Sequence, residues 1–299
     1  MNSDNNTIYA KLIALAAIVA CSFIVLEYAI KHSNIYYIGF YMTATGALTA
    51  HVLSRCIIRL SMPNIIAAVI TAAYFVLKFE FVDKYDVEIV LVVAAVCPVI
   101  VYVIEQVFVN RKTINVAVLL TLIVALIACS LVPILISDID ILFDRALMVM
   151  TIAFALAIFT SRLTRTKLKG VNPASSLTMG LYLSACCFAA LSIFYGKTVM
   201  LSPFSIPGLI AVSLGVFTTG FGMLLQDDAA KKLPVYIIEV LSLSRLLFAS
   251  AFFIVMQWFT SYSTNLTSLF LLCLLTYLAS IGLLIKQSNT NHFTKENTL

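Results

Sequence analysis

The chain has 299 residues, of which 62% are hydrophobic and only 11% charged, with a formal net charge of +5; soluble globular domains average about 45–50% apolar and about 25% charged. A mean hydropathy of +1.05 excludes an ordinary soluble domain and also a single anchor on a soluble body, because such a mixture averages near neutral. The same figures exclude disorder, collagen, coiled coils and small disulfide scaffolds, which need high charge, a strict repeat or dense cysteine.

Apolar segments follow one another along the whole chain, separated by charges, prolines, glycines and asparagines. A helix needs roughly 20 apolar residues to cross a hydrocarbon core of about 30 Å. The run VAVLLTLIVALIACSLVPILI at 116–136 is apolar on every side, which indicates a membrane helix and not an alternating strand. The sequence therefore predicts an all-α integral membrane protein with ten transmembrane helices, near 10–29, 36–58, 62–79, 87–109, 114–136, 143–161, 173–195, 205–226, 233–259 and 266–285.

Basic residues are distributed unequally between the two predicted faces. With the N-terminus inside, thirteen lysines and arginines lie on the inner side, five, including Lys78, lie outside, and Arg245 lies within a span. The positive-inside rule then predicts a multi-pass protein with both termini in the cytoplasm. The densest basic run, SRLTRTKLKG at 161–170, contains Arg162 and Arg165. It is interpreted as an inner loop and not as a nucleic-acid patch, so no nucleic-acid partner is predicted.

The spans divide into two halves of five, residues 1–137 and 138–299, and the second half ends in a short tail. Because five is odd, the second half starts on the opposite side of the membrane, which predicts an inverted repeat. The layout at 80–108, a short polar hinge before a long helix with a disruptive residue at its middle, recurs at 227–255. Inverted repeats are typical of carriers that alternate between inward-open and outward-open states around a midplane site. A duplicated scaffold without transport is the alternative.

Three segments resemble one family. They are FTSRLTRTKLKGVNP at the start of the second half, CPVIVYV in the fourth span, and FTTGFGMLLQDDAAKKLPVYIIEVLSL in the eighth and ninth. With the five-plus-five layout, the chain resembles the EamA-like members of the drug/metabolite transporter superfamily. The resemblance implies carriage of amino acids, nucleotide-derived or other amphipathic metabolites, usually without ATP. It also implies a bacterial inner membrane as the location.

Arg245 is the most informative polar residue within a predicted span. An ionisable group at the centre of a membrane helix costs about 2.5–3.5 kcal/mol on insertion scales, so it indicates a functional site. Arg245 lies about 20 Å along the ninth span at 1.5 Å per residue, and Ser242 and Ala249 share its helix face. A guanidinium pairs with carboxylate or phosphate, so Arg245 is predicted to bind an anionic group of the substrate. The alternative is a structural arginine paired with a carboxylate.

Two glutamates lie at similar depths in corresponding helices, Glu105 in the fourth span and Glu239 in the ninth. Pro98, Tyr102 and Glu105 share one helix face by their spacing, and Pro98 is a predicted hinge. Burial favours the neutral form of a carboxyl group, so either glutamate could exchange a proton and couple transport to a proton gradient. Both glutamates, Tyr102 and Ser242 are therefore predicted substrate-binding residues beside Arg245. The alternative is a glutamate bonded to a neighbouring helix or to Arg245.

The alternative function is a polytopic membrane enzyme of the prenyltransferase type, which holds Mg²⁺ and pyrophosphate on Asp-rich loops. The candidate carboxylates are DIDILFD at 138–144 and the pair Asp227 and Asp228, but the predicted topology places these groups on opposite faces. Walker A, G-x-S-x-G, H-E-x-x-H and Cys-x-x-Cys motifs are absent from the sequence, so no enzymatic activity, cofactor or metal is predicted. The predicted partners are a small-molecule substrate and the lipid bilayer, and the sequence leaves a homodimer open.

Overall fold

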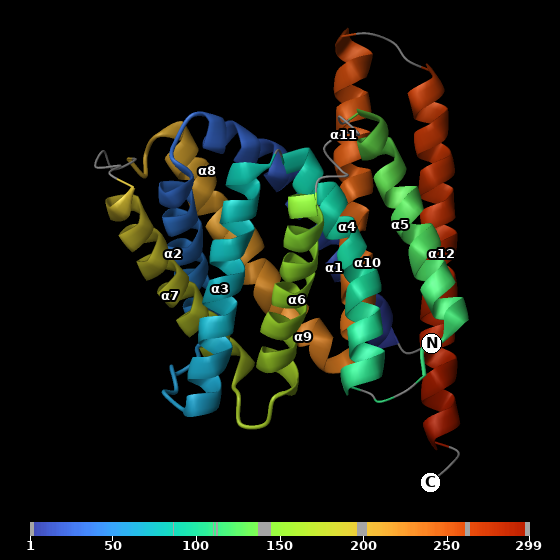
Figure 1. The fold of residues 1–299 in the computed structure, drawn as a ribbon, viewed down its shortest axis with the longest axis horizontal. Coiled ribbons are helices and arrows are strands. Elements are labelled where there is room, and N and C mark those ends of the chain that lie inside the picture. The colour runs from blue at the N-terminus through green and yellow to red at the C-terminus, as the bar shows by residue number, and fades with distance from the viewer. Residues whose placement is uncertain are drawn as a thin grey trace.

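The computed structural model describes residues 3–85, 87–109, 111, 113–136, 145–195, 202–260 and 264–296. The predicted all-α class is confirmed for this part of the chain, which folds into helices joined by short connections (Figure 1). The helices are α1 Ser3–Lys31, α2 Ile35–Ser54, α3 Met62–Lys84, α4 Val87–Ile104, η1 Glu105–Val109, α5 Val116–Ile136, α6 Arg145–Lys167, α7 Pro173–Phe194, α8 Ile206–Leu214, η3 Gly215–Phe221, α9 Gly222–Lys232, α10 Val235–Ser242, α11 Ser244–Thr260 and α12 Thr264–Glu296.

Each predicted segment overlaps one helix or a run of consecutive helices. The second segment, 36–58, was predicted too long, because α2 ends at Ser54 and residues 55–58 are not helical. The segments η1 and η3 are π-helical and continue α4 and α8 without a break, and Leu243 alone separates α10 from α11. Within the described residues, four helices are long and apolar enough to cross a membrane, as a multi-pass membrane protein requires. These are Met62–Lys84, Pro173–Phe194, Ile206–Lys232 and Leu269–Gln287.

Polar caps and prolines start several of the helices. The side chain of Asn34 accepts the backbone N–H of Tyr36 at the start of α2. Asn172 accepts the N–H of Ser175 in the same way, and a proline occupies the first turn of α7. These caps satisfy backbone donors that have no partner inside the helix, and proline is tolerated there because its missing N–H is not needed. Local sequence therefore fixes where these helices begin.

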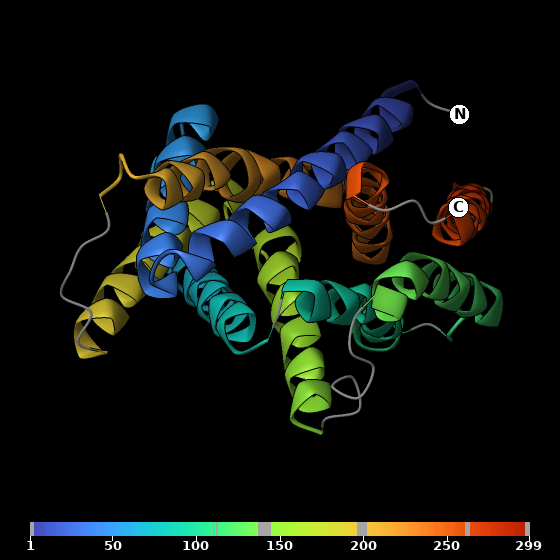
Figure 2. The ribbon, with the colours of Figure 1, turned by 90° about the horizontal axis from the view of Figure 1, so that it is seen from above.

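Several helix contacts join residues 1–137 to residues 138–299. The most extensive contact joins α2 to α7, and α5 packs along α12. Other contacts occur in matching sets, since α3 packs on α7 as η3 packs on α2, and α4 packs on α6 as α11 packs on α1. Seen from above in Figure 2, α1 and α6 run obliquely across the view, whereas α12 is seen nearly end-on.

Two of these contacts use a glycine against a threonine. A Cβ atom added to Gly180 of α7 would lie 2.7 Å from Cβ of Thr71 in α3. One added to Gly46 of α2 would lie 2.8 Å from Cγ2 of Thr219 in η3. The missing side chains allow close helix approach, as small residues do at membrane helix interfaces. Both interfaces therefore place a glycine against a threonine.

The end of α6 corrects one prediction. Residues 161–167 continue the helix instead of forming an inner loop, and the connection to α7 is correspondingly short. Arg162 and Arg165 are buried, with 6% and 1% of their surface exposed. Their burial is possible because carboxylates from α9 and α10 face them. A dense run of basic residues therefore indicates a solvated loop only when no carboxylates from other helices pair with it.

Candidate functional site

A cavity of about 80 Å³ lies between α1, α2, α3, α6, the α8–α9 run and α10–α11. Its charged lining residues among those that the structure describes are Lys78, Arg162, Glu239 and Arg245. Polar groups are added by Ser22, Tyr74, Thr218, Thr219, Gln226 and Ser242, and the remaining described lining residues are apolar. The lining thus carries three cationic groups and one carboxylate.

Arg162 and Glu239 form the central ion pair of this site. The Nη1 group of Arg162 donates to Oε1 of Glu239, which joins α6 to α10. The Nη2 group of the same arginine donates to Oε1 of Gln226 in α9, at 2.6 Å. Both charged side chains are almost fully buried. The charge of Glu239 is therefore compensated inside the protein by Arg162. Lys78 and Arg245 line the same cavity.

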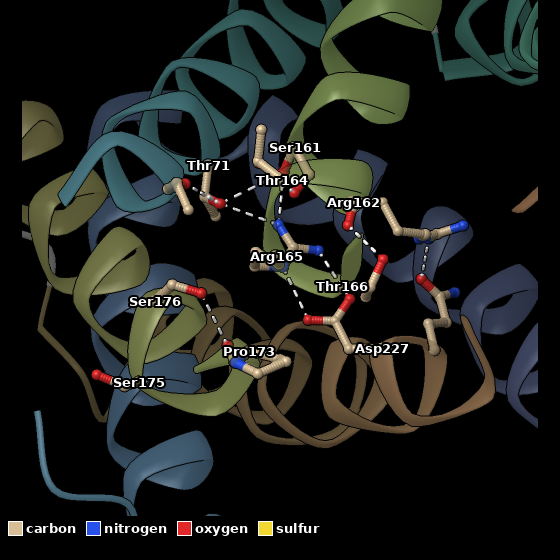
Figure 3. A network of polar contacts seen from close by, with 12 residues as sticks. Thr71, Ser161, Arg162, Thr164, Arg165, Thr166, Pro173, Ser175, Ser176 and Asp227 are labelled. Atoms are coloured by element: carbon tan, nitrogen blue, oxygen red, sulfur yellow. Dashed lines mark hydrogen bonds and ion pairs between the residues drawn. The ribbon is translucent and has the colours of Figure 1, made fainter. Parts of the chain in front are cut away.

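Arg165 forms a second buried ion pair one helix turn further along α6 (Figure 3). Its Nε and Nη2 groups donate to the two carboxylate oxygens of Asp227, at 2.8 and 2.9 Å. Its Nη1 group donates to the hydroxyls of Thr71 in α3 and Ser161 in α6. This bidentate geometry is the strong form of an arginine–carboxylate contact. The network therefore ties α3, α6 and α9 together.

Glu105 and Tyr102 share a helix face, as predicted, and that face meets the start of α10. The carboxylate of Glu105 accepts the backbone N–H groups of Val235 and Tyr236, at 3.3 and 3.2 Å. The Tyr102 ring packs edge-on against the ring of Tyr236, and its hydroxyl accepts the backbone N–H of Asn115. Neither residue belongs to the cavity lining. Glu105 instead caps α10, the helix that carries Glu239.

Of the predicted site residues, Arg245, Glu239 and Ser242 come together at the cavity. Ser242 donates its hydroxyl proton to the backbone carbonyl of Glu239, 2.7 Å away. Ser242 is the last residue of α10 and Arg245 lies in α11, which begins after Leu243, yet both side chains line the cavity. Pro98 is buried within α4, which continues past it.

Lys78 and Arg162 are charged lining residues that were not predicted from the sequence to belong to the site. The charge distribution predicted that Lys78 lies at the outer end of the third span. However, α3 continues to Lys84 and places Lys78 inside the helix. Its side chain lines the same cavity as Arg245. The signal available in the sequence was the set of apolar side chains on both sides of Lys78 in FVLKFEF, because a lysine inside a membrane helix indicates a functional position.

The carboxylates considered for a prenyltransferase metal site are differently placed. Asp227 pairs with buried Arg165, and Asp228 pairs with exposed Lys231 at 3.1 Å. The other candidate, 138–144, lies outside the described residues. Among the residues that the structure describes, no group of three His, Cys, Asp or Glu side chains could hold a metal ion.

Comparison with known proteins identifies the fold but not a family. No family model matches the chain, and no curated protein matches it. One solved crystal structure superposes with a TM-score of 0.74 at 13% sequence identity, covering 97% of this chain and 100% of the other. The architecture is therefore shared with another protein over nearly its full length.

Proposed function

We propose that the protein is a secondary transporter of a small amphipathic anion, such as an amino acid or an amino-acid-like or nucleotide-derived compound, and that it works by alternating access. The observation that carries this proposal is the cavity between the helices, which is lined by Lys78 and Arg245 beside the Arg162–Glu239 pair. Lys78 and Arg245 line the same cavity, and ammonium and guanidinium groups are the side chains that bind carboxylate or phosphate. A carboxylate or phosphate of the substrate would bind between them.

The architecture that we propose for this carrier is a ten-span inverted repeat of the EamA-like kind. Matching contacts support it, since the α3–α7 and η3–α2 interfaces each place a glycine against a threonine. The pairs α2–α7 and α5–α12 then join corresponding helices of the two halves. The cavity lies where the halves meet, which is where inverted-repeat carriers bind their substrates.

The two buried ion pairs would close one side of the carrier. Arg165–Asp227 and Arg162–Glu239 join α6 to α9 and α10. In Figure 1 the connections α6–α7 and α9–α10 lie at the same end of the bundle. Lys169 and Lys232 flank these connections, so the positive-inside rule assigns this end to the cytoplasm. Opening toward the cytoplasm would separate α6 from α9 and α10.

Proton coupling is assigned to Glu239 in this proposal. Glu239 lines the cavity and faces Arg162, so its protonation would weaken the ion pair that holds α6 against α10. Glu105, which caps α10, acts instead as a positioning residue. Transport should then follow an imposed pH gradient in the wild type and lose that dependence in Glu239→Gln. Indifference of the wild type to the gradient would remove the coupling.

A ligand screen followed by counterflow in liposomes tests the function. Amino acids, nucleosides, S-adenosylmethionine and sugar phosphates are screened by thermal shift, because a bound ligand stabilises the folded state by mass action. Counterflow is then measured for each ligand that shifts the transition. Arg245→Ala and Lys78→Met should lower the affinity for the anion at least tenfold.

The matched control is Arg59→Ala, which removes an exposed arginine outside the cavity lining and should transport like the wild type. Normal transport by Arg245→Ala and Lys78→Met would refute the site. A ligand that shifts the thermal transition without any counterflow would refute the carrier and favour a receptor or an enzyme.

A further inference from the structure

An apolar groove lies beside the cavity, between α1 and the α8–η3 run. Its volume is about 400 Å³, against about 80 Å³ for the cavity. The groove is lined by Ile18 and Val25 of α1 and by Leu209 and Phe217 of α8 and η3, among other apolar residues. These four side chains are between 40% and 57% exposed. The groove therefore opens to the surroundings of the helix bundle.

The groove and the cavity are adjacent. Ser22, Leu214 and Thr218 line both of them. Ser22 donates its hydroxyl proton to the carbonyl of Val19, and Thr218 donates to the carbonyl of Leu214. Each of these bonds stays within one helical run, so separating α1 from η3 breaks neither of them. The wall between groove and cavity can therefore open at low cost in hydrogen bonds.

The cavity alone is smaller than an ordinary ligand pocket. Pockets for drug-sized ligands measure roughly 300–1,000 Å³. The 80 Å³ of the cavity thus suit a charged end group with little beyond it. The groove supplies the missing volume, and its lining is apolar where that of the cavity is cationic.

From this juxtaposition we infer that the transported anion carries a hydrocarbon chain, which lies in the groove between α1 and η3 while its charged end lies at Arg245 and Lys78. The inference rests on the proposed function and narrows its substrate class to acyl-chain anions that enter sideways from the bilayer. The π-helical backbone of η3 forms part of this wall, and π-bulges in helices are frequent at functional sites.

The test is a chain-length series of N-acylglycines with acyl groups of two, four, six and eight carbons. Binding is measured by titration calorimetry on the full chain in lipid nanodiscs, with empty nanodiscs as the blank for partitioning. Each buried methylene contributes about 0.8 kcal/mol, so Kd should fall up to about fourfold for each added methylene. The wild type should show this rise in affinity across the whole series.

Two variants fill the groove from opposite walls, Leu209→Trp from α8 and Ile18→Trp from α1. In either variant, Kd should no longer fall as the acyl chain lengthens. The same result from both variants shows that it does not come from the misfolding of one of them. The control is Leu120→Trp, a similarly exposed leucine of α5 outside the groove lining, which should keep the rise in affinity. A rising series that is the same in Leu209→Trp and Leu120→Trp overturns the inference.

The outcomes also separate this inference from the proposed function. If the Kd of the wild type is the same for all four acylglycines and binding still requires Arg245, the inference of a hydrocarbon chain is wrong and the proposed anion carrier is not affected. The absence of binding by every acylglycine, in a protein that exchanges another anion by counterflow, does the same. Failure of every anion to show Arg245-dependent counterflow overturns the function and this inference together.

Discussion

The buried pair of Arg165 and Asp227 offers a quantitative test of how the bundle is held together. Asp227 is 3% exposed and accepts two hydrogen bonds from a guanidinium that is 1% exposed. In Asp227→Asn the arginine keeps its charge but loses its counter-charge in a site without access to water. Removing one partner of a buried ion pair costs about 3–5 kcal/mol, so we expect this loss in the free energy of unfolding.

The neighbouring residue provides the matched control. Asp228 pairs with Lys231, but the two side chains are 65% and 54% exposed. An exposed pair contributes about 0–1 kcal/mol, so Asp228→Asn should leave stability almost unchanged. The double variant Arg165→Met/Asp227→Leu should cost less than Asp227→Asn, because apolar replacement of a whole buried pair is often close to neutral.

Equilibrium unfolding in mixed micelles, followed by circular dichroism, measures these differences. The two single variants change the same chemical group at adjacent positions of α9, so effects on expression or micelle binding cancel in their comparison. An Asp227→Asn variant that is no less stable than Asp228→Asn would refute the reasoning. A double variant as unstable as Asp227→Asn would show that the helices need the ion pair itself and not merely charge balance.

Two further predictions concern packing and helix capping. Gly180→Ala should lower the free energy of unfolding by about 1–3 kcal/mol through overpacking, since the new Cβ would meet Thr71 at 2.7 Å. The control is Gly282→Ala, whose new Cβ would meet no atom of the described residues within 4 Å beyond its own helix backbone. It should be neutral or slightly stabilising in the same unfolding measurement. Glu105→Ala should cost about 1–3 kcal/mol for each N–H of α10 that it leaves unsatisfied. Glu105→Gln keeps one carbonyl acceptor, so it should recover part of this stability and retain pH-driven transport. Loss of that transport in the stable Gln variant would contradict the positioning role.

Local features of the sequence were sufficient for the helices and for part of the site. Hydropathy is a sum over neighbouring residues, so the apolar runs located the helices, and Asn172 before Pro173 marked the start of α7. Arg245 and Glu239 could be selected because each is an isolated charge in a long apolar segment. Ser242 followed from its position on the same helix face as Arg245.

Which charges compensate one another was decided by the tertiary structure. Arg162 pairs with a carboxylate 77 residues away, and Glu105 accepts backbone N–H groups about 130 residues away. Lys78 reaches the cavity because α3 packs beside α6. Electrostatic and hydrogen-bond energies depend on distance in space, which the order of residues along the chain does not contain. Sequence alone therefore determined where charges enter the apolar segments, and helix packing determined which of them form ion pairs and which line the cavity.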